Sequence, residues 1–217
     1  NKGEALDISD IRGKYTTKNL DINDLNKSPF KQFEIWFNDA MNENLLEPNA
    51  FTLATVGNEM MPSVRTVLLK YFSEKGFVFF TNYDSKKAKQ IDQNPKVAAL
   101  FTWLPLERQI KIEGSVEKIS KAESLKYFLS RPKGSQLGAW VSRQSEVISS
   151  RALLEQKFEE MKNKFLNKEI PFPSFWGGYI IKPIRIEFWQ GGEDRLHDRF
   201  LYEFKEDNSW EIKRLAP

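Results

Sequence analysis

The chain has 217 residues, 40% of them hydrophobic and 29% charged, which is typical of a folded globular protein rather than a disordered one. It has no cysteine and a single histidine, His197, so disulfides, a thiolate nucleophile, cysteine-bound metal centres and multi-histidine metal sites are excluded. The 33 Lys and Arg against 30 Asp and Glu leave a net charge of +3, without the basic excess typical of a nucleic-acid-binding protein.

The N-terminal part of the sequence divides at residue 28. Residues 1–27 are polar and aperiodic, which predicts a flexible arm that becomes ordered against a ligand or partner. Ser28-Pro29 is a helix N-cap followed by proline at the first helical position, and apolar residues at helical spacing predict a helix over 29–46. Residues 28–217 contain no Pro/Gly-rich linker, so we expect them to form one domain.

The rest of the chain shows many strand patterns and few helical ones. Strands are predicted at 51–56, 64–71, 77–81, 96–103, 108–118, 178–189, 199–205 and 210–215. Helices are predicted at 85–93, 120–130, a short segment ending near 140, and 150–165. Hairpin turns join most of the strands, which favours a mainly β (α+β) fold, an antiparallel barrel with peripheral helices.

The sequence carries none of the common nucleotide or hydrolase motifs. It has no P-loop, no strand-linked G-x-G-x-x-G and no G-x-S-x-G elbow. Its apolar stretches are far shorter than the ~20 residues of a membrane-spanning helix, and its first residues have no apolar signal core. We therefore expect a cytoplasmic protein without a membrane segment.

Two basic segments favour a site for anionic ligands. Arg65 and Lys70 stand at the ends of one predicted strand, and they should face opposite ways unless a bulge intervenes. Ser85 is expected to cap a helix whose first turn carries Lys86 and Lys87. Cations there oppose the helix dipole, a cost usually accepted only with an anion present. Solvated surface charges explain the first segment better, and the second equally well, when each is taken alone.

Two further groups of residues suit phosphate or carboxylate recognition. In the segment 189–199 the single histidine lies between Arg195 and Arg199, which favours a ligand-binding loop over a structural histidine. Tyr127 and Arg131 share a helix face, and with Ser135 they suit a phosphate ester. The residues alone thus predict a barrel that binds phosphorylated small molecules, without identifying a reaction.

At these same segments the sequence resembles the pyridoxine (pyridoxamine) 5′-phosphate oxidase family. The similarity covers nearly the whole chain and follows the family's motifs in order: R-x-V-L-L-K at 65–70, F-F-T-N at 79–82, S-K-K-A at 85–88, L-E-R-Q at 106–109, S-R-P-K-G-S-Q-L-G-A-W at 130–140, P-S-F-W-G-G at 173–178, F-W-Q-G-G-E-D-R-L-H-D-R at 188–199 and the terminal R-L-A-P. One departure is Lys86, where many relatives have Arg; it can bind phosphate as a point charge but without a bidentate fork.

The resemblance implies an FMN-binding split β-barrel that forms a homodimer with FMN at the subunit interface. FMN would be held by Arg65, Thr66, Val67, Leu68, Leu69, Lys70, Phe80, Thr81, Lys86, Lys87, Gln109, Gln144, Ser145, Trp189 and Arg199. The substrate would be held by Arg12, Tyr15, Lys70, Tyr127, Arg131, Ser135, Arg195, Leu196 and His197, and the resemblance assigns catalytic roles to Arg195 and His197.

The activity implied is an FMN-dependent oxidation of pyridoxamine or pyridoxine 5′-phosphate to pyridoxal 5′-phosphate. A hydride would pass from C4′ to the flavin, which dioxygen would reoxidise to give hydrogen peroxide. The alternatives are another split-barrel flavin reductase or flavin-binding protein, which should lack these motifs in combination, and a nucleic-acid-binding barrel, which the modest charge disfavours. We expect no nucleic-acid and no membrane partner.

Overall fold

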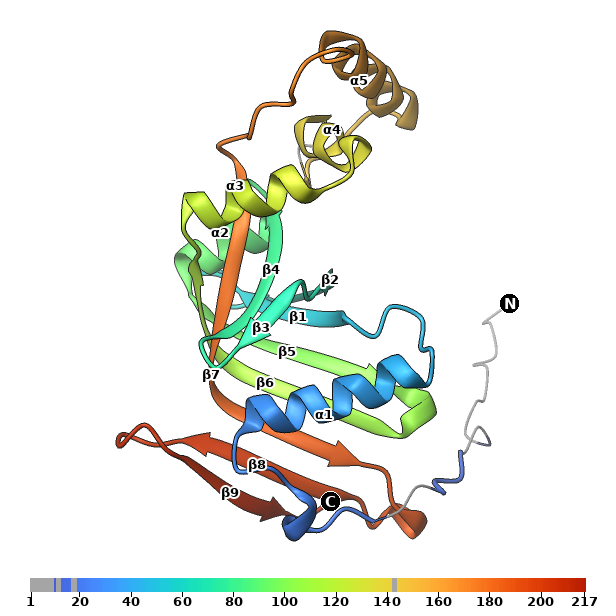
Figure 1. The fold of residues 1–217 in the computed structure, drawn as a ribbon, viewed down its shortest axis with the longest axis vertical. Coiled ribbons are helices and arrows are strands. Elements are labelled where there is room, and N and C mark those ends of the chain that lie inside the picture. The colour runs from blue at the N-terminus through green and yellow to red at the C-terminus, as the bar shows by residue number, and fades with distance from the viewer. Residues whose placement is uncertain (1–9, 11–12, 17–18, 142–143) are drawn as a thin grey trace, which may run out of the picture.

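A nine-stranded antiparallel sheet organises the part of the chain described in this computed structural model, which is residues 10, 13–16, 19–141 and 144–217 (Figure 1). The strand order is β2-β1-β5-β6-β7-β4-β3, with β8 paired to β7 and β9 to β8. The strands are β1 (Ala50–Val56), β2 (Pro62–Leu68), β3 (Tyr71–Ser73), β4 (Gly76–Asn82), β5 (Lys96–Trp103), β6 (Arg108–Lys118), β7 (Trp176–Gln190), β8 (Asp198–Phe204) and β9 (Trp210–Leu215). The helices are α1 (Pro29–Asn42), α2 (Lys86–Gln93), α3 (Lys121–Ser130), α4 (Lys133–Val141) and α5 (Arg151–Lys164), with short 3-10 turns η1 (Ile22–Asp24), η2 (Leu104–Leu106) and η3 (Glu193–Arg195).

Strand β7 joins two regions of the molecule. It pairs with β6 along one edge, and with β4 and then β8 along the other. Pro183 lies between the stretches that pair with β4 and β8, beside a register shift at Glu113/Gly114, and strands tolerate proline at such irregularities. A Cβ on Gly114 would lie 2.1 Å from the Lys182 carbonyl oxygen, so this close approach requires glycine. In Figure 1 β7 runs from the helices α3–α5 to the β8–β9 hairpin.

Aromatic side chains of α1 pack against the sheet and form part of the hydrophobic core. The helix lies across β5 and β6 (Figure 1), and Phe33 and Trp36 on its apolar face are almost fully buried. The Phe33 ring lies 5.1 Å from that of Phe101, and the Trp36 ring 5.2 Å from that of Phe188. Burial of each such side chain contributes ~1.5–3 kcal/mol, so α1 and the sheet stabilise one another.

The predicted mainly β fold and its elements are confirmed, with two corrections. Residues 64–71 were expected to form one strand, but β2 ends at Leu68 and β3 starts at Tyr71. Between them the chain changes partner, because the Leu69 N–H donates to the Asn49 carbonyl oxygen and the Lys70 N–H to that of Val78. Helix α1 ends at Asn42 rather than at 46.

Among the described residues, no helix is both long and apolar enough to cross a membrane. The expected arm, residues 1–27, lies partly outside the described residues, so its flexibility stays a prediction, as does the division at residue 28.

Candidate active site

A cavity of about 1060 Å³ opens between β2, β4, α2 and the α3–α4 pair. It brings together most of the residues that the sequence singled out, from segments far apart in the chain. Those lining it are Arg65, Thr66, Val67, Leu68, Lys70, Phe80, Thr81, Lys86, Lys87, Tyr127, Arg131, Ser135, Gln144 and Ser145. Leu69, from the same motif, is instead packed in the hydrophobic core.

Lys87 lines the cavity at the start of α2. Ser85 caps α2 as expected, accepting the Ala88 N–H, and this places Lys87 in the first turn. Its Nζ donates to Gln144 Oε1 at 2.8 Å and to Thr81 Oγ1 at 3.0 Å, and the residue is only 6% exposed. Burial, together with the charge of Arg65, lowers the pKa of Lys87 to about 8.

Arg65 adds a second cation to the cavity, near enough to Lys87 for its charge to act on that side chain. Its Nη1 donates to the Leu53 carbonyl oxygen and to Thr55 Oγ1. Within the described ranges neither Arg65 nor Lys87 forms an ion pair with a carboxylate. Two close cations without an anion, at the N-terminus of a helix, form a site for a phosphate group.

The lowered pKa of Lys87 has a measurable effect on stability. Between pH 8 and the ordinary lysine value of 10.5 the folded chain binds fewer protons than the unfolded chain, so folding is favoured increasingly as pH rises through this window. Relative to Lys87→Met, the ligand-free wild type should gain ~1–3 kcal/mol from pH 8 to 10. Urea unfolding at each pH measures this difference, and Lys89→Met, an exposed lysine of the same helix, is the control. A difference that does not change with pH would contradict the assignment.

Arg131 lines the cavity between α3 and α4. Its guanidinium lies over the Trp176 ring, 4.5 Å from the ring centroid, and its Nη1 is buried without a hydrogen-bond partner in the described structure. Burial lowers the pKa of Arg131. A buried, unpartnered donor is costly, and a phosphate oxygen would satisfy it.

Aromatic rings form one wall beside Arg131. Tyr127 stacks on Phe80 with ring centroids 3.9 Å apart, and Phe80 in turn stacks on Trp176 at 5.3 Å. Trp176 was not singled out in the sequence, because a tryptophan at the start of a buried strand looks like core. Arg131, between α3 and α4, therefore supplies the cation, and rings from α3, β4 and β7 form the apolar wall against which a planar ring can lie.

Lys70 enters the same cavity as Arg65, although an unbroken strand would point them to opposite faces. The predicted opposite orientation is wrong, and the reason is not the bulge that was allowed for: the strand ends at Leu68, and the chain turns toward β4 before Lys70. Lys70 thus adds a further cation to the lining of this cavity.

A second group of predicted site residues lies outside this cavity. Gln109, Trp189 and Arg199 are directly opposite one another on β6, β7 and β8, and so form one row across the sheet. The loop that follows β7 carries Arg195 and Leu196, both exposed, and Asp194 and Arg195 have left-handed backbones with φ of 52° and 65°. Such backbone conformations cost energy in non-glycine residues and are frequent where a loop presents side chains to a ligand.

His197 is held in one orientation within this second group. Its Nδ1 accepts the Gly192 N–H at 3.1 Å, so the neutral ring carries its proton on Nε2. The His197 ring lies 4.7 Å from that of Trp189 and 5.1 Å from that of Tyr15. The Nε2–H is therefore the group that His197 can offer to a ligand.

The segment before α1 is tied to the same region. The Thr16 N–H donates to the Glu107 carboxylate, and the Leu20 N–H donates to Asp198 Oδ2 at 2.9 Å. These contacts hold Tyr15 against His197. Sequence reasoning missed Glu107 and Asp198, because acidic residues beside turns look solvated. Arg12, a predicted substrate-binding residue, lies outside the described residues.

Comparison with known proteins covers both halves of the chain. Residues 37–165 match the family described as pyridoxamine 5′-phosphate oxidase, and residues 176–217 match the pyridoxine 5′-phosphate oxidase C-terminal dimerisation region. A pyridoxine/pyridoxamine 5′-phosphate oxidase of Aliarcobacter butzleri is 73% identical over 98% of this chain and 100% of its own, and one of Rippkaea orientalis is 63% identical over the same shares. The crystal structure of PhzG from Burkholderia lata 383, in complex with tetrahydrophenazine-1-carboxylic acid, is similar with a TM-score of 0.87 and 26% identity, covering 94% of this chain and 100% of that one.

Proposed function

Because the chain belongs to the pyridoxamine 5′-phosphate oxidase family, we propose that it oxidises pyridoxamine or pyridoxine 5′-phosphate to pyridoxal 5′-phosphate, with FMN as cofactor and dioxygen as electron acceptor. The observation that best supports this is a single cavity lined by cations from distant parts of the chain: Lys87 with Arg65, and Arg131 with its buried, unpartnered Nη1. A reaction between a phosphorylated cofactor and a phosphorylated substrate needs two phosphate sites of this kind.

The residues present fit FMN. The pair Arg65 and Lys87, with Lys86 beside them, matches the charge of a phosphate monoester, and no described carboxylate already neutralises it. Thr81, Gln144 and Ser145 add polar groups on the same side. When bound, FMN would supply the redox chemistry, a two-electron acceptor for the hydride equivalent from C4′ of the substrate that dioxygen can reoxidise with formation of hydrogen peroxide.

The protein's own groups bind and orient the substrate. Arg131 and Lys70 would bind its phosphate with charge-assisted hydrogen bonds, aided by the hydroxyls of Tyr127 and Ser135. The stacked rings of Phe80, Tyr127 and Trp176 would shield the side of the substrate beside Arg131 from water. We assign Arg195 and His197 to the pyridine ring, where the His197 Nε2–H donates a hydrogen bond and fixes the direction of C4′.

The second group of residues points to a homodimer. Gln109, Trp189, Arg199 and the loop with Arg195 do not line the cavity of their own chain, and residues 176–217 match a dimerisation region. We propose that this group completes the cavity of a partner subunit, so that each dimer holds two sites with FMN at the interface.

The cytoplasmic location also stays a prediction, to be checked by cell fractionation.

An absorbance spectrum tests the proposed function. The purified protein should show flavin bands that bleach on anaerobic addition of pyridoxamine 5′-phosphate and return when air is admitted. Flavin bands that ignore the substrate would favour a split-barrel flavin reductase instead. A protein that binds no FMN would contradict the proposal altogether.

A further inference from the structure

The surroundings of Arg199 indicate how this side chain is held. Trp189 and Arg199 are direct cross-strand partners, and Glu187 lies two residues before Trp189 on the same face of β7. Glu187 is therefore the diagonal neighbour of Arg199, within reach of a long side chain. Neither the sequence motifs nor the cavity includes Glu187.

Glu187 is a carboxylate in an unusual environment. Its side chain is only 8% exposed, and its Oε1 accepts the Arg199 Nε–H at 2.7 Å. Its Oε2 lies 3.4 Å from Lys111 Nζ. Burial alone would raise the pKa of this carboxyl, but the two cations outweigh it and hold the pKa below its ordinary value. Glu187 thus stays charged and paired throughout the neutral range.

These contacts fix the plane of the Arg199 guanidinium. The Arg199 Nε–H donates to the Glu187 carboxylate, and Nη1 donates to the carbonyl oxygen of Ala216 at 2.8 Å. A planar group held at two points cannot rotate about its long side chain. In the described structure its contacts use Nε and Nη1, so Nη2 is the nitrogen that could donate to a ligand without displacing either contact.

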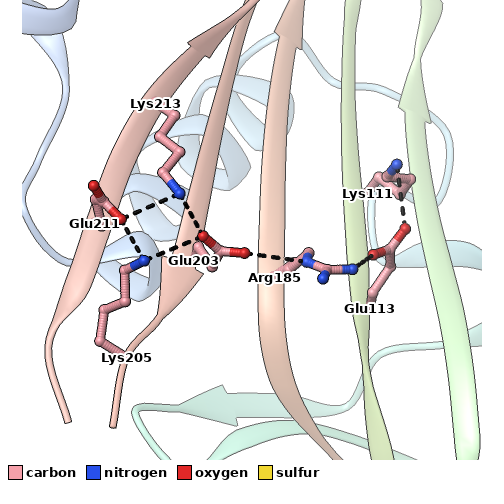
Figure 2. Close-up of polar contacts among 7 residues, drawn as sticks. All are labelled: Lys111, Glu113, Arg185, Glu203, Lys205, Glu211 and Lys213. Atoms are coloured by element: carbon pink, nitrogen blue, oxygen red, sulfur yellow. Dashed lines mark hydrogen bonds and ion pairs between the residues drawn. The ribbon is translucent and has the colours of Figure 1, made fainter. Parts of the chain in front are cut away.

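Glu187 differs from the other carboxylates on this face. Figure 2 shows a ladder of alternating charges across the sheet, formed by Lys111, Glu113, Arg185, Glu203, Lys205, Glu211 and Lys213. In it Arg185 Nη1 lies 3.3 Å from Glu113 Oε2, and Arg185 Nε lies 3.6 Å from Glu203 Oε1. The members of this ladder are 27–49% exposed, and such exposed pairs contribute little to stability. Glu187 is joined to the ladder through Lys111 but is buried and contacts the predicted flavin-binding residue itself.

We propose that Glu187 is a positioning residue that holds the Arg199 guanidinium in the orientation in which it contacts FMN. The inference rests on the proposed function, which assigns Arg199 to the cofactor. Because Glu187 already neutralises Arg199, that arginine serves as an oriented hydrogen-bond donor rather than as an additional positive charge. The opposite role, in which Glu187 only offsets positive charge, predicts that its removal would tighten the binding of an anionic cofactor.

Titration of the ligand-free full-length protein with FMN, followed by quenching of flavin fluorescence, tests this. Glu187→Ala should raise the Kd of FMN about tenfold. Glu187→Gln keeps an acceptor for the Arg199 Nε–H, so it should raise this Kd by a smaller factor. Glu203→Gln removes a carboxylate of the exposed ladder that does not contact Arg199, and its Kd should match the wild type. Thermal unfolding of each variant confirms that the comparison is between folded proteins.

A double-mutant cycle separates positioning from a general structural effect. In an Arg199→Ala background, Glu187→Ala should change the Kd by less than about twofold, because the residue through which Glu187 acts is gone. The inference would be overturned if Glu187→Ala raised the Kd of FMN by the same factor with and without Arg199. It would also be overturned if the Glu187→Ala protein bound FMN at least as tightly as the wild type. A wild type that binds no FMN would instead overturn the proposed function.

Discussion

Replacement of Arg131 by methionine should raise KM for pyridoxamine 5′-phosphate by ~30–1000-fold and leave the Kd of FMN within about twofold. The guanidinium has a buried Nη1 without a partner, so the phosphate of the substrate gains a desolvated, charge-assisted contact there. Loss of one member of such a pair costs about 2–4 kcal/mol. Methionine keeps an apolar stem against Trp176, so the wall of the cavity should survive.

Two measurements check this expectation: steady-state kinetics gives KM for the substrate, and titration with flavin gives the Kd of FMN. Binding that is equal in the ground and transition states affects KM while kcat is retained. Arg151→Met, on an exposed arginine of α5 that pairs with Glu155, is the matched control and should leave both constants unchanged. An unaltered KM in Arg131→Met would remove this residue from the phosphate site.

Arg195→Ala should lower kcat by about 100-fold without loosening FMN, because the side chain orients the pyridine ring rather than the cofactor. Arg195 is exposed in the ligand-free chain and lies on a left-handed backbone after η3, so the substitution removes no core contact. Alanine and arginine are similarly strained at this φ, and the loop should keep its path.

Turnover under saturating substrate, with FMN content measured on the same samples, tests this role. Arg195→Lys should recover part of the activity, since it restores the charge but not the planar fork. Arg185→Ala provides the control, because Arg185 is a half-exposed arginine of β7 that pairs with Glu113 and Glu203. Normal turnover of Arg195→Ala would show that the loop does not act on the substrate.

The sequence predicted most of the fold because local signals agreed with the final structure. The strands at 96–103 and 108–118 were placed to the residue, since alternation and turns mark both ends. The break after Leu68 was missed because apolar residues continue through it. What ends that strand is a change of partner, from Asn49 to Val78, and hydrogen bonds between such distant residues leave no local pattern.

The candidate site was predictable in part. Lys87 beside a helix cap and Arg131 one turn after Tyr127 carry local chemical signals, and both line the cavity. Glu187 carries none, because a glutamate in an alternating strand normally faces solvent. Its burial depends on the register that places Arg199 diagonally across from it, and register is a property of the assembled sheet.

The continuity of β7 has a consequence for mixtures of inactive variants. Trp176, beneath Arg131, begins this 15-residue strand, and the loop with Arg195 follows its end. At ~3.3 Å per residue the strand extends over ~45 Å, far more than one small substrate can bridge. In a homodimer, Arg131 of one subunit would therefore act with the Arg195 loop of the other. Arg131→Met subunits and Arg195→Ala subunits that are unfolded together and refolded should then complement each other. Each mixed dimer would hold one doubly altered site and one wild-type site. Random pairing would therefore restore about a quarter of the wild-type activity.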